Sequence, residues 1–321
     1  MPKRKITFKL FCFSCLFLLA SGLAAAQMRP DIGSALRYEA KPFWPVVRKS
    51  AFSADSLRLS VEQLCDSTFA GRLSGSREMV QVSAYIASRF RKAGLQAFGG
   101  TYFHNFELPS GGVGHNVAGC IPGRRNEWIV LEAWYDSLGC PDGLFYPGAD
   151  ANASALAMLF AIAGRLPAEP ECGIILLACD AHHNDAAGAK AFIKQNRKLK
   201  INRVICLDIV GSSLEPLDKR RPRYLMALGG KPAARKLERC ARLGRIEMYY
   251  DYYRSDSFTE LFLHKTGEQK HFYNAGLPCT VFTSGITYNT NRPSDTPESL
   301  DYLAMRDRAL VLLRYVLSLI G

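Results

Sequence analysis

Apolar residues in this chain fall into short continuous runs that alternate with amphipathic stretches. Six runs are typical of strands covered on both faces of a sheet: 116–121, 128–135, 173–180, 203–210, 224–228 and 279–283. Four stretches have the apolar spacing of helices: 152–166, 186–197, 231–244 and 302–320. Strands that alternate with helices predict an α/β fold, here three layers α/β/α around a mixed, mainly parallel sheet.

Two further helices are expected ahead of the first strand. Residues 58–69 form a short amphipathic stretch. A longer helix is expected through Ala93, with Ser76 as its N-cap and Gly94 as its stop.

The first 26 residues have the pattern of a secretory signal peptide. Four basic residues precede an uncharged apolar stretch from Leu10 to Ala26, which ends in three alanines. We expect cleavage after Ala26 and export to a periplasm or the cell exterior, with a bacterial source favoured. An uncleaved membrane anchor is the alternative, but the stretch is short for a membrane span. Residues 27–57 then form a lead-in segment, and residues 58–321 form one domain.

Composition excludes a disordered chain, because 48% of the 321 residues are hydrophobic and 22% are charged. The formal net charge is +12, and +8 remains once the four basic residues of the signal peptide are removed. Basic clusters at 197–203, 218–224 and 231–245 suit anionic partners, although solvated surface is the simpler interpretation. No nucleic-acid-binding motif accompanies them, so we expect no nucleic-acid partner, and no membrane partner after cleavage.

Eight cysteines follow the signal peptide. An even number in an exported protein permits disulfides, but the spacing leaves their pairing open. A Cys179 thiol nucleophile near His182 is a further alternative, although Cys179 lies in an apolar run where a buried, inert thiol is expected.

Polar residues follow several of the predicted strands. Asp136 follows the strand at 128–135, Asp180 ends the strand at 173–180 and precedes His182 and His183, and Asp208 lies near the end of the strand at 203–210. Because α/β sheets bind ligands at the carboxyl ends of their strands, these residues predict an active site at that edge.

Five sequence elements in order resemble the aminopeptidase Y family of zinc exopeptidases, which also includes bacterial leucyl aminopeptidases and glutaminyl cyclases. They are FAGRLSGS with the helix after it, NVAGCIPG, GADANAS, LDIVG and SDTPESLDY. The resemblance covers residues 58–317. It implies two zinc ions held by two His and three carboxylates, and a Glu that acts as the general base on zinc-bound water.

The resemblance places the bridging carboxylate on Asp150 and the strand-end carboxylate on Asp208. Trp134 and Asn291 stand where the two His ligands are expected, and an indole cannot ligate zinc. Asp136 corresponds to the residue that orients the first His ligand.

A Glu-Glu pair that supplies the base and a further ligand is replaced by His182 and His183. Four of six chemical positions are therefore substituted, and we expect zero or one zinc ion and no nucleotide cofactor. The favoured interpretation is a catalytically degenerate member that keeps a cleft for a peptide or protein N-terminus.

The alternative is an active metal-dependent exopeptidase or glutaminyl cyclase with a rebuilt single-metal site at Asp150, His183 and Asp208. His182 would be its base, and His115 or His271 would supply an extra ligand.

Two structural expectations follow from the resemblance. The first is a cis peptide bond between Asp150 and Ala151. The second is a small or apolar pocket bounded by Trp134, Asp150, His182, His183, Asp208 and Asn291.

Overall fold

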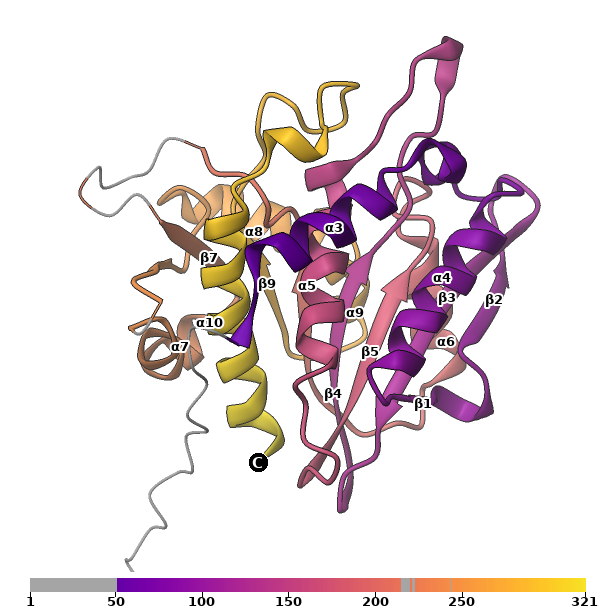
Figure 1. Ribbon diagram of the computed structural model, residues 1–321. Helices are drawn as coiled ribbons and strands as arrows, with labels where there is room; N and C mark the ends of the chain where they lie inside the picture. Colours follow the sequence, from indigo (N-terminus) through magenta and orange to yellow (C-terminus); the bar gives the residue numbers. More distant parts are fainter. Residues whose placement is uncertain (1–50, 215–219, 221–222, 243) are drawn as a thin grey trace, which may run out of the picture. The chain divides into compact units, whose positions relative to one another are not determined.

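A computed structural model describes residues 51–321 of this chain, except 215–219, 221–222 and 243. The predicted signal peptide and most of the lead-in segment lie outside the described residues. The described residues belong to one compact unit, Trp44–Gly321. A mixed nine-stranded sheet forms its middle layer, with helices on both faces (Figure 1). The predicted α/β fold of three layers is thereby confirmed.

The four central strands of the sheet, β5, β4, β6 and β9, are parallel to one another. The sheet order is β1-β3-β5-β4-β6-β9-β7-β8, and β2 also pairs with β3. Antiparallel pairings attach β3 to β5 and β7 to β9. The strands are β1 (Gln96–Ala97), β2 (Phe103–Glu107), β3 (Val113–Ile121), β4 (Arg125–Trp134), β5 (Cys172–Cys179), β6 (Ile201–Leu207), β7 (Tyr224–Leu228), β8 (Glu247–Tyr249) and β9 (Cys279–Thr283).

Helices cover the sheet in two groups, each with its own apolar core. The first core takes residues from α3 (Ala54–Leu64), α4 (Met79–Lys92), α5 (Ser154–Ala163) and α10 (Tyr302–Ile320). The second takes residues from α6 (Ala187–Gln195), α8 (Asp256–Lys265) and α9 (Gln269–Asn274). The helix α7 (Ala234–Ala241) packs beside α10 and β8. Within the described part of the chain, no helix is long and apolar enough to cross a membrane.

The alternation of side chains along β4 decides which core each residue joins. Leu131 and Ala133 belong to the first core, whereas Val130 and Trp134 belong to the second. Trp134 therefore reaches the carboxyl edge of the sheet on the face that α6, α8 and α9 cover.

The six predicted strands and the four predicted helices of the α/β alternation are present, with shifted ends. The first helix begins at Ala54, four residues earlier than predicted, and Ser53 caps it. The prediction that Ser76 caps the next helix is wrong, because α4 begins at Met79 and the Ser76 hydroxyl has no hydrogen-bond partner. Gly94 follows this helix with φ of 85°, as a stop requires. The pattern did not predict β1, β2, β8 or α8.

One buried arginine ties together the segments that surround the carboxyl edge. Arg72 is fully buried and donates hydrogen bonds to the backbone carbonyls of Leu64, Tyr135, Pro147 and Gly148. These carbonyls come from three separate parts of the chain. Arg72 therefore fixes the segment after β4 against the segment that leads into α5.

All eight described cysteines are free thiols, so no disulfide forms among them. Cys179 is fully buried in β5, and burial raises the pKa of its thiol well above the usual range. A thiol that stays protonated in a dry core is a poor nucleophile.

Candidate functional site

A small cavity opens at the carboxyl ends of β4 and β6, at the edge where the sequence places the site. Its volume is about 190 Å³. Asp208 is the only carboxylate among the described residues that line it, and most of the other lining is apolar. The lining residues are Trp134, Ala151, His182, Asp208, Ile209, Phe258, Phe262, Thr266, Gly267, Ile286, Thr290 and Asn291.

The indole of Trp134 lines this cavity and contacts two of its other residues. It is 2% exposed, and its Nε1 donates a hydrogen bond of 3.1 Å to Oδ1 of Asp208. The imidazole of His182 stacks on the indole, with ring centroids 3.9 Å apart and planes 10° apart. Trp134 thus fills space, and its indole N–H is hydrogen-bonded to one of the two carboxylate oxygens of Asp208.

His182 is paired with Glu268, a buried residue that precedes α9. The His182 Nδ1 lies 2.9 Å from Oε2 of Glu268 and 3.0 Å from Oε1. Burial alone lowers the pKa of His182, but the charge and hydrogen bond of Glu268 outweigh it, and the pKa rises to about 9. His182 is therefore an imidazolium at neutral pH, stacked on an aromatic ring in a cation–π contact. A protonated imidazole does not suit the general-base role expected from the sequence.

His183, in contrast, is uncharged. Burial and the positive charge of His182 lower the pKa of His183 to about 4, so its imidazole is neutral. Its Nε2 is buried without a hydrogen-bond partner, and its ring does not line the cavity.

Asp136 fixes this pair of histidines through the backbone. Its carboxylate accepts hydrogen bonds from the amides of His182 (2.8 Å) and His183 (3.3 Å). Burial and the neighbouring Asp180 raise the pKa of Asp136 to about 7. The sequence predicted that Asp136 would orient a side chain at position 134; instead it orients the segment that carries the histidines.

Burial also raises the pKa of Asp208, to about 6, against the lowering effect of the His182 charge. Its Oδ1 accepts the Trp134 hydrogen bond, which favours the ionised form.

Asp150 points away from the cavity. Its carboxylate accepts hydrogen bonds from the amide of Gly211 (2.7 Å), from the amide and hydroxyl of Ser212, and from the hydroxyl of Ser154 (3.3 Å). The next residue, Ala151, lines the cavity in its place.

The predicted cis bond between Asp150 and Ala151 is wrong: the cis peptide bond lies one residue later, between Ala151 and Asn152. Four of the six residues predicted to bound the pocket do line it, namely Trp134, His182, Asp208 and Asn291.

The two histidines considered as extra ligands lie elsewhere. The Nδ1 of His115 is 2.9 Å from the side-chain oxygen of Asn105, and the Nε2 of His271 is 3.0 Å from the backbone oxygen of Asp185. Neither lines the cavity.

Several residues of the site were missed by the sequence analysis. Glu268 lies in a polar stretch without a motif, and only folding brings it to His182, 86 positions away. Phe258, Phe262 and Ile286 give the cavity its apolar wall. The one sequence signal near this wall is the aromatic-rich stretch MYYDYYRSDSF at 248–258, whose last residue is Phe258.

The sequence profile of peptidase family M28 matches residues 116–316. The chain belongs to peptidase family M28. Solved structures with a similar fold include LapB from Legionella pneumophila, at 16% identity over 85% of this chain and 73% of that chain, with a TM-score of 0.65. BSAP, a zinc aminopeptidase from Bacillus subtilis, has 12% identity over 83% and 94%, with a TM-score of 0.63.

A glutaminyl cyclase from Bacteroides thetaiotaomicron, bound to N-acetylhistamine, has 18% identity over 83% of this chain and 97% of that chain, with a TM-score of 0.63. At these identities the likeness concerns the fold. No curated protein sequence matches the chain significantly.

The zinc ions implied by the family resemblance do not fit the donors of this M28 chain. Zinc needs three or four neutral His, thiolate or carboxylate donors that converge on one point. His182 is protonated and paired, Asp150 is turned away, and Asp208 is bonded to an indole. Across the described ranges, no three His, Cys, Asp or Glu residues are grouped so that they could hold a metal ion.

Proposed function

We propose that this M28-family protein does not catalyse metal-dependent hydrolysis, and that its cavity binds a peptide through its free N-terminus. The proposal takes its relation to aminopeptidases from the sequence resemblance and from the solved neighbours. The alternative of a rebuilt single-metal site has less support, because Asp150, His183 and Asp208 do not share a cavity.

The proposed loss of hydrolytic activity rests on one observation. Trp134 and the imidazolium of His182 form a stacked pair at the carboxyl edge of the sheet. The indole hydrogen bond to Asp208 and the Glu268 pairing of His182 use donors that a metal would need. Among the described lining residues, His182 is protonated and therefore no general base, and the one carboxylate, Asp208, already accepts the indole hydrogen bond.

Binding of an N-terminus is supported by the charge and lining of the cavity. Asp208 is the one carboxylate among its described lining residues and offers a partner to an α-ammonium group. Phe258, Phe262 and Ile286 offer apolar surface to the first side chain of the peptide. A charged hydrogen bond inside an apolar pocket gives orientation together with affinity.

Metal content tests the first half of the proposal. The protein is loaded with zinc and desalted, and zinc per chain is measured beside the Asp150→Ala/Asp208→Ala variant. We expect a value near zero for both proteins, and no release of amino acid from aminopeptidase substrates. About one zinc per chain in the wild type, absent from the double variant, would refute the loss of the metal site.

Peptide binding tests the second half. Trp134 lines the cavity, so a change in tryptophan fluorescence reports occupancy. We expect saturable binding of a Leu-initiated tripeptide, no binding of its N-acetylated form, and at least about ten-fold weaker binding to Asp208→Asn. Equal binding of the free and acetylated peptides would refute recognition of the ammonium group.

A further inference from the structure

The positive charge of the chain is concentrated in one short segment. Residues 219–248 contain ten Lys or Arg and two Glu, so they carry +8 of the formal +12. Beyond the predicted signal peptide, the rest of the chain has 27 basic and 27 acidic residues. The segment therefore accounts for the whole net charge of the chain after the predicted signal peptide. Its electric field attracts anions to one edge of the sheet.

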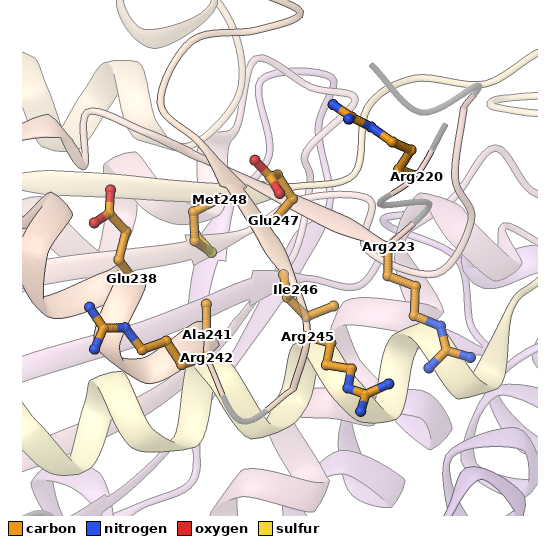
Figure 2. A pocket seen from close by; sticks show the side chains of 9 residues that line it. All are labelled: Arg220, Arg223, Glu238, Ala241, Arg242, Arg245, Ile246, Glu247 and Met248. Atoms are coloured by element: carbon orange, nitrogen blue, oxygen red, sulfur yellow. The ribbon is translucent and has the colours of Figure 1, made fainter. Parts of the chain in front are cut away.

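The described residues of this segment surround a second cavity, of about 800 Å³. One wall comes from α7 and the residues after it, and another from the chain that enters β8. Arg220 and Arg223, which precede β7, complete the wall. The lining residues are Arg220, Arg223, Glu238, Ala241, Arg242, Arg245, Ile246, Glu247 and Met248 (Figure 2).

The cavity combines an apolar floor with a charged rim. Ala241 and Ile246 are 3% and 7% exposed, and in Figure 2 they lie with Met248 between the charged side chains. On the rim, Arg242 and Arg245 are exposed and form no ion pair with another described residue.

Arg223 is fixed at the cavity by a buried partner. Its guanidinium donates to the carboxylate of Asp307, a fully buried residue of α10 that also pairs with Arg306. A guanidinium that is already oriented loses less side-chain entropy when it binds an anion.

This lining selects the chemistry of a ligand. Guanidinium groups bind phosphate through paired hydrogen bonds, and guanidinium groups on different sides of one cavity (Figure 2) suit more than one phosphate. The cavity is far larger than a phosphate ion, and its apolar floor suits the carbon face of a ring. The carboxylate of Glu238 accepts hydrogen bonds from hydroxyl groups. We propose that this cavity binds a sugar that carries two phosphate groups, either free or as the headgroup of a lipid.

Calorimetric titration with fructose 1,6-bisphosphate at low ionic strength tests the proposal, with fructose as the unphosphorylated comparison. The cavity variant is Arg242→Gln/Arg245→Gln. The matched control is Arg235→Gln/Lys236→Gln, which removes two charges from the same region but lines a different cavity. Thermal unfolding of both variants checks that each is folded.

We expect saturable binding of the bisphosphate, no binding of fructose, and affinity weakened about ten-fold or more in the cavity variant only. Failure of the bisphosphate to bind would overturn the proposal. Equal weakening in both variants would also overturn it, because it indicates diffuse electrostatic attraction.

Vesicles of phosphatidylcholine with and without phosphatidylinositol 4-phosphate distinguish the two sources of the sugar phosphate. Vesicle binding that free bisphosphate displaces supports recognition of a headgroup in this cavity. Vesicle binding that the free bisphosphate does not displace would overturn the cavity proposal in favour of a flat membrane-binding surface.

Discussion

The pairing of His182 with Glu268 makes a quantitative prediction. The pKa of His182 rises from the usual 6.5 to about 9, and each pKa unit corresponds to about 1.4 kcal/mol. The protonated pair therefore contributes about 3 kcal/mol to the free energy of unfolding. Glu268→Gln keeps the shape of the side chain but removes its charge. We expect this variant to lose up to about 3 kcal/mol at pH 7. The pKa of His182 should fall from about 9 toward 6.5, because the burial that lowers it remains while Asp208 and Asp136 still raise it.

Urea denaturation measures the free energy, and an NMR titration of the His182 ring measures the pKa. The sign of the pH dependence follows from the raised pKa of His182. The protonated histidine stabilises the folded state fully below pH 6.5, and this stabilisation is lost as the pH rises through about 9. The difference between wild type and Glu268→Gln should accordingly shrink between pH 7 and pH 10. Glu260→Gln is the matched control, since Glu260 and His264 form an exposed pair at 3.3 Å that is worth under about 1 kcal/mol. Equal losses in the two variants, or a wild-type His182 that titrates near 6.5, would refute the reasoning.

Three further predictions concern the same edge of the sheet. The raised pKa values of Asp208 (about 6) and Asp136 (about 7) mean that the folded state binds protons more tightly than the unfolded state. The free energy of unfolding should therefore fall as the pH rises from about 4 to 7. In urea denaturation, Asp208→Asn should make this decrease with pH smaller, and an unchanged decrease would contradict the assignment. Trp134→His restores an imidazole but should leave the zinc content near zero, because Ala151 offers no carboxylate and His182 stays protonated; one zinc per chain would contradict this. Arg72→Met should remove four buried hydrogen bonds, after which the Gly148 carbonyl still accepts from the amide of Ala153. We expect a cost of more than about 3 kcal/mol, measured as lost soluble, cooperatively unfolding protein; near-wild-type stability would show that water replaces the guanidinium.

The fold could be predicted from sequence wherever an element is long and strongly apolar. The central strand β5 and the helix α10 were found because they are buried along most of their length. The edge strands β1 and β8 have two and three residues, too few to show an alternation. The helix α8 was missed because it has only ten residues and its apolar residues are confined to 258 and 261–263.

The site was predictable only in outline. The carboxyl ends of the strands located it, and the family motifs selected Trp134, His182 and Asp208, which do meet at one cavity. The direction of the Asp150 side chain was not predictable, because it depends on the amides of Gly211 and Ser212, about 60 positions later. Charge states were equally hidden, since Glu268 keeps His182 protonated whereas burial leaves the neighbouring His183 neutral.

The electrostatics of the site show how its buried carboxylates are compensated within the chain. Three carboxylates, Asp136, Asp208 and Glu268, all act to raise the pKa of His182. Such a group of buried acids is costly without a compensating positive charge. Here the imidazolium of His182 supplies that charge from within the chain. We therefore expect that a single substitution toward the family pattern does not create a metal site at this place unless it also displaces the imidazolium of His182.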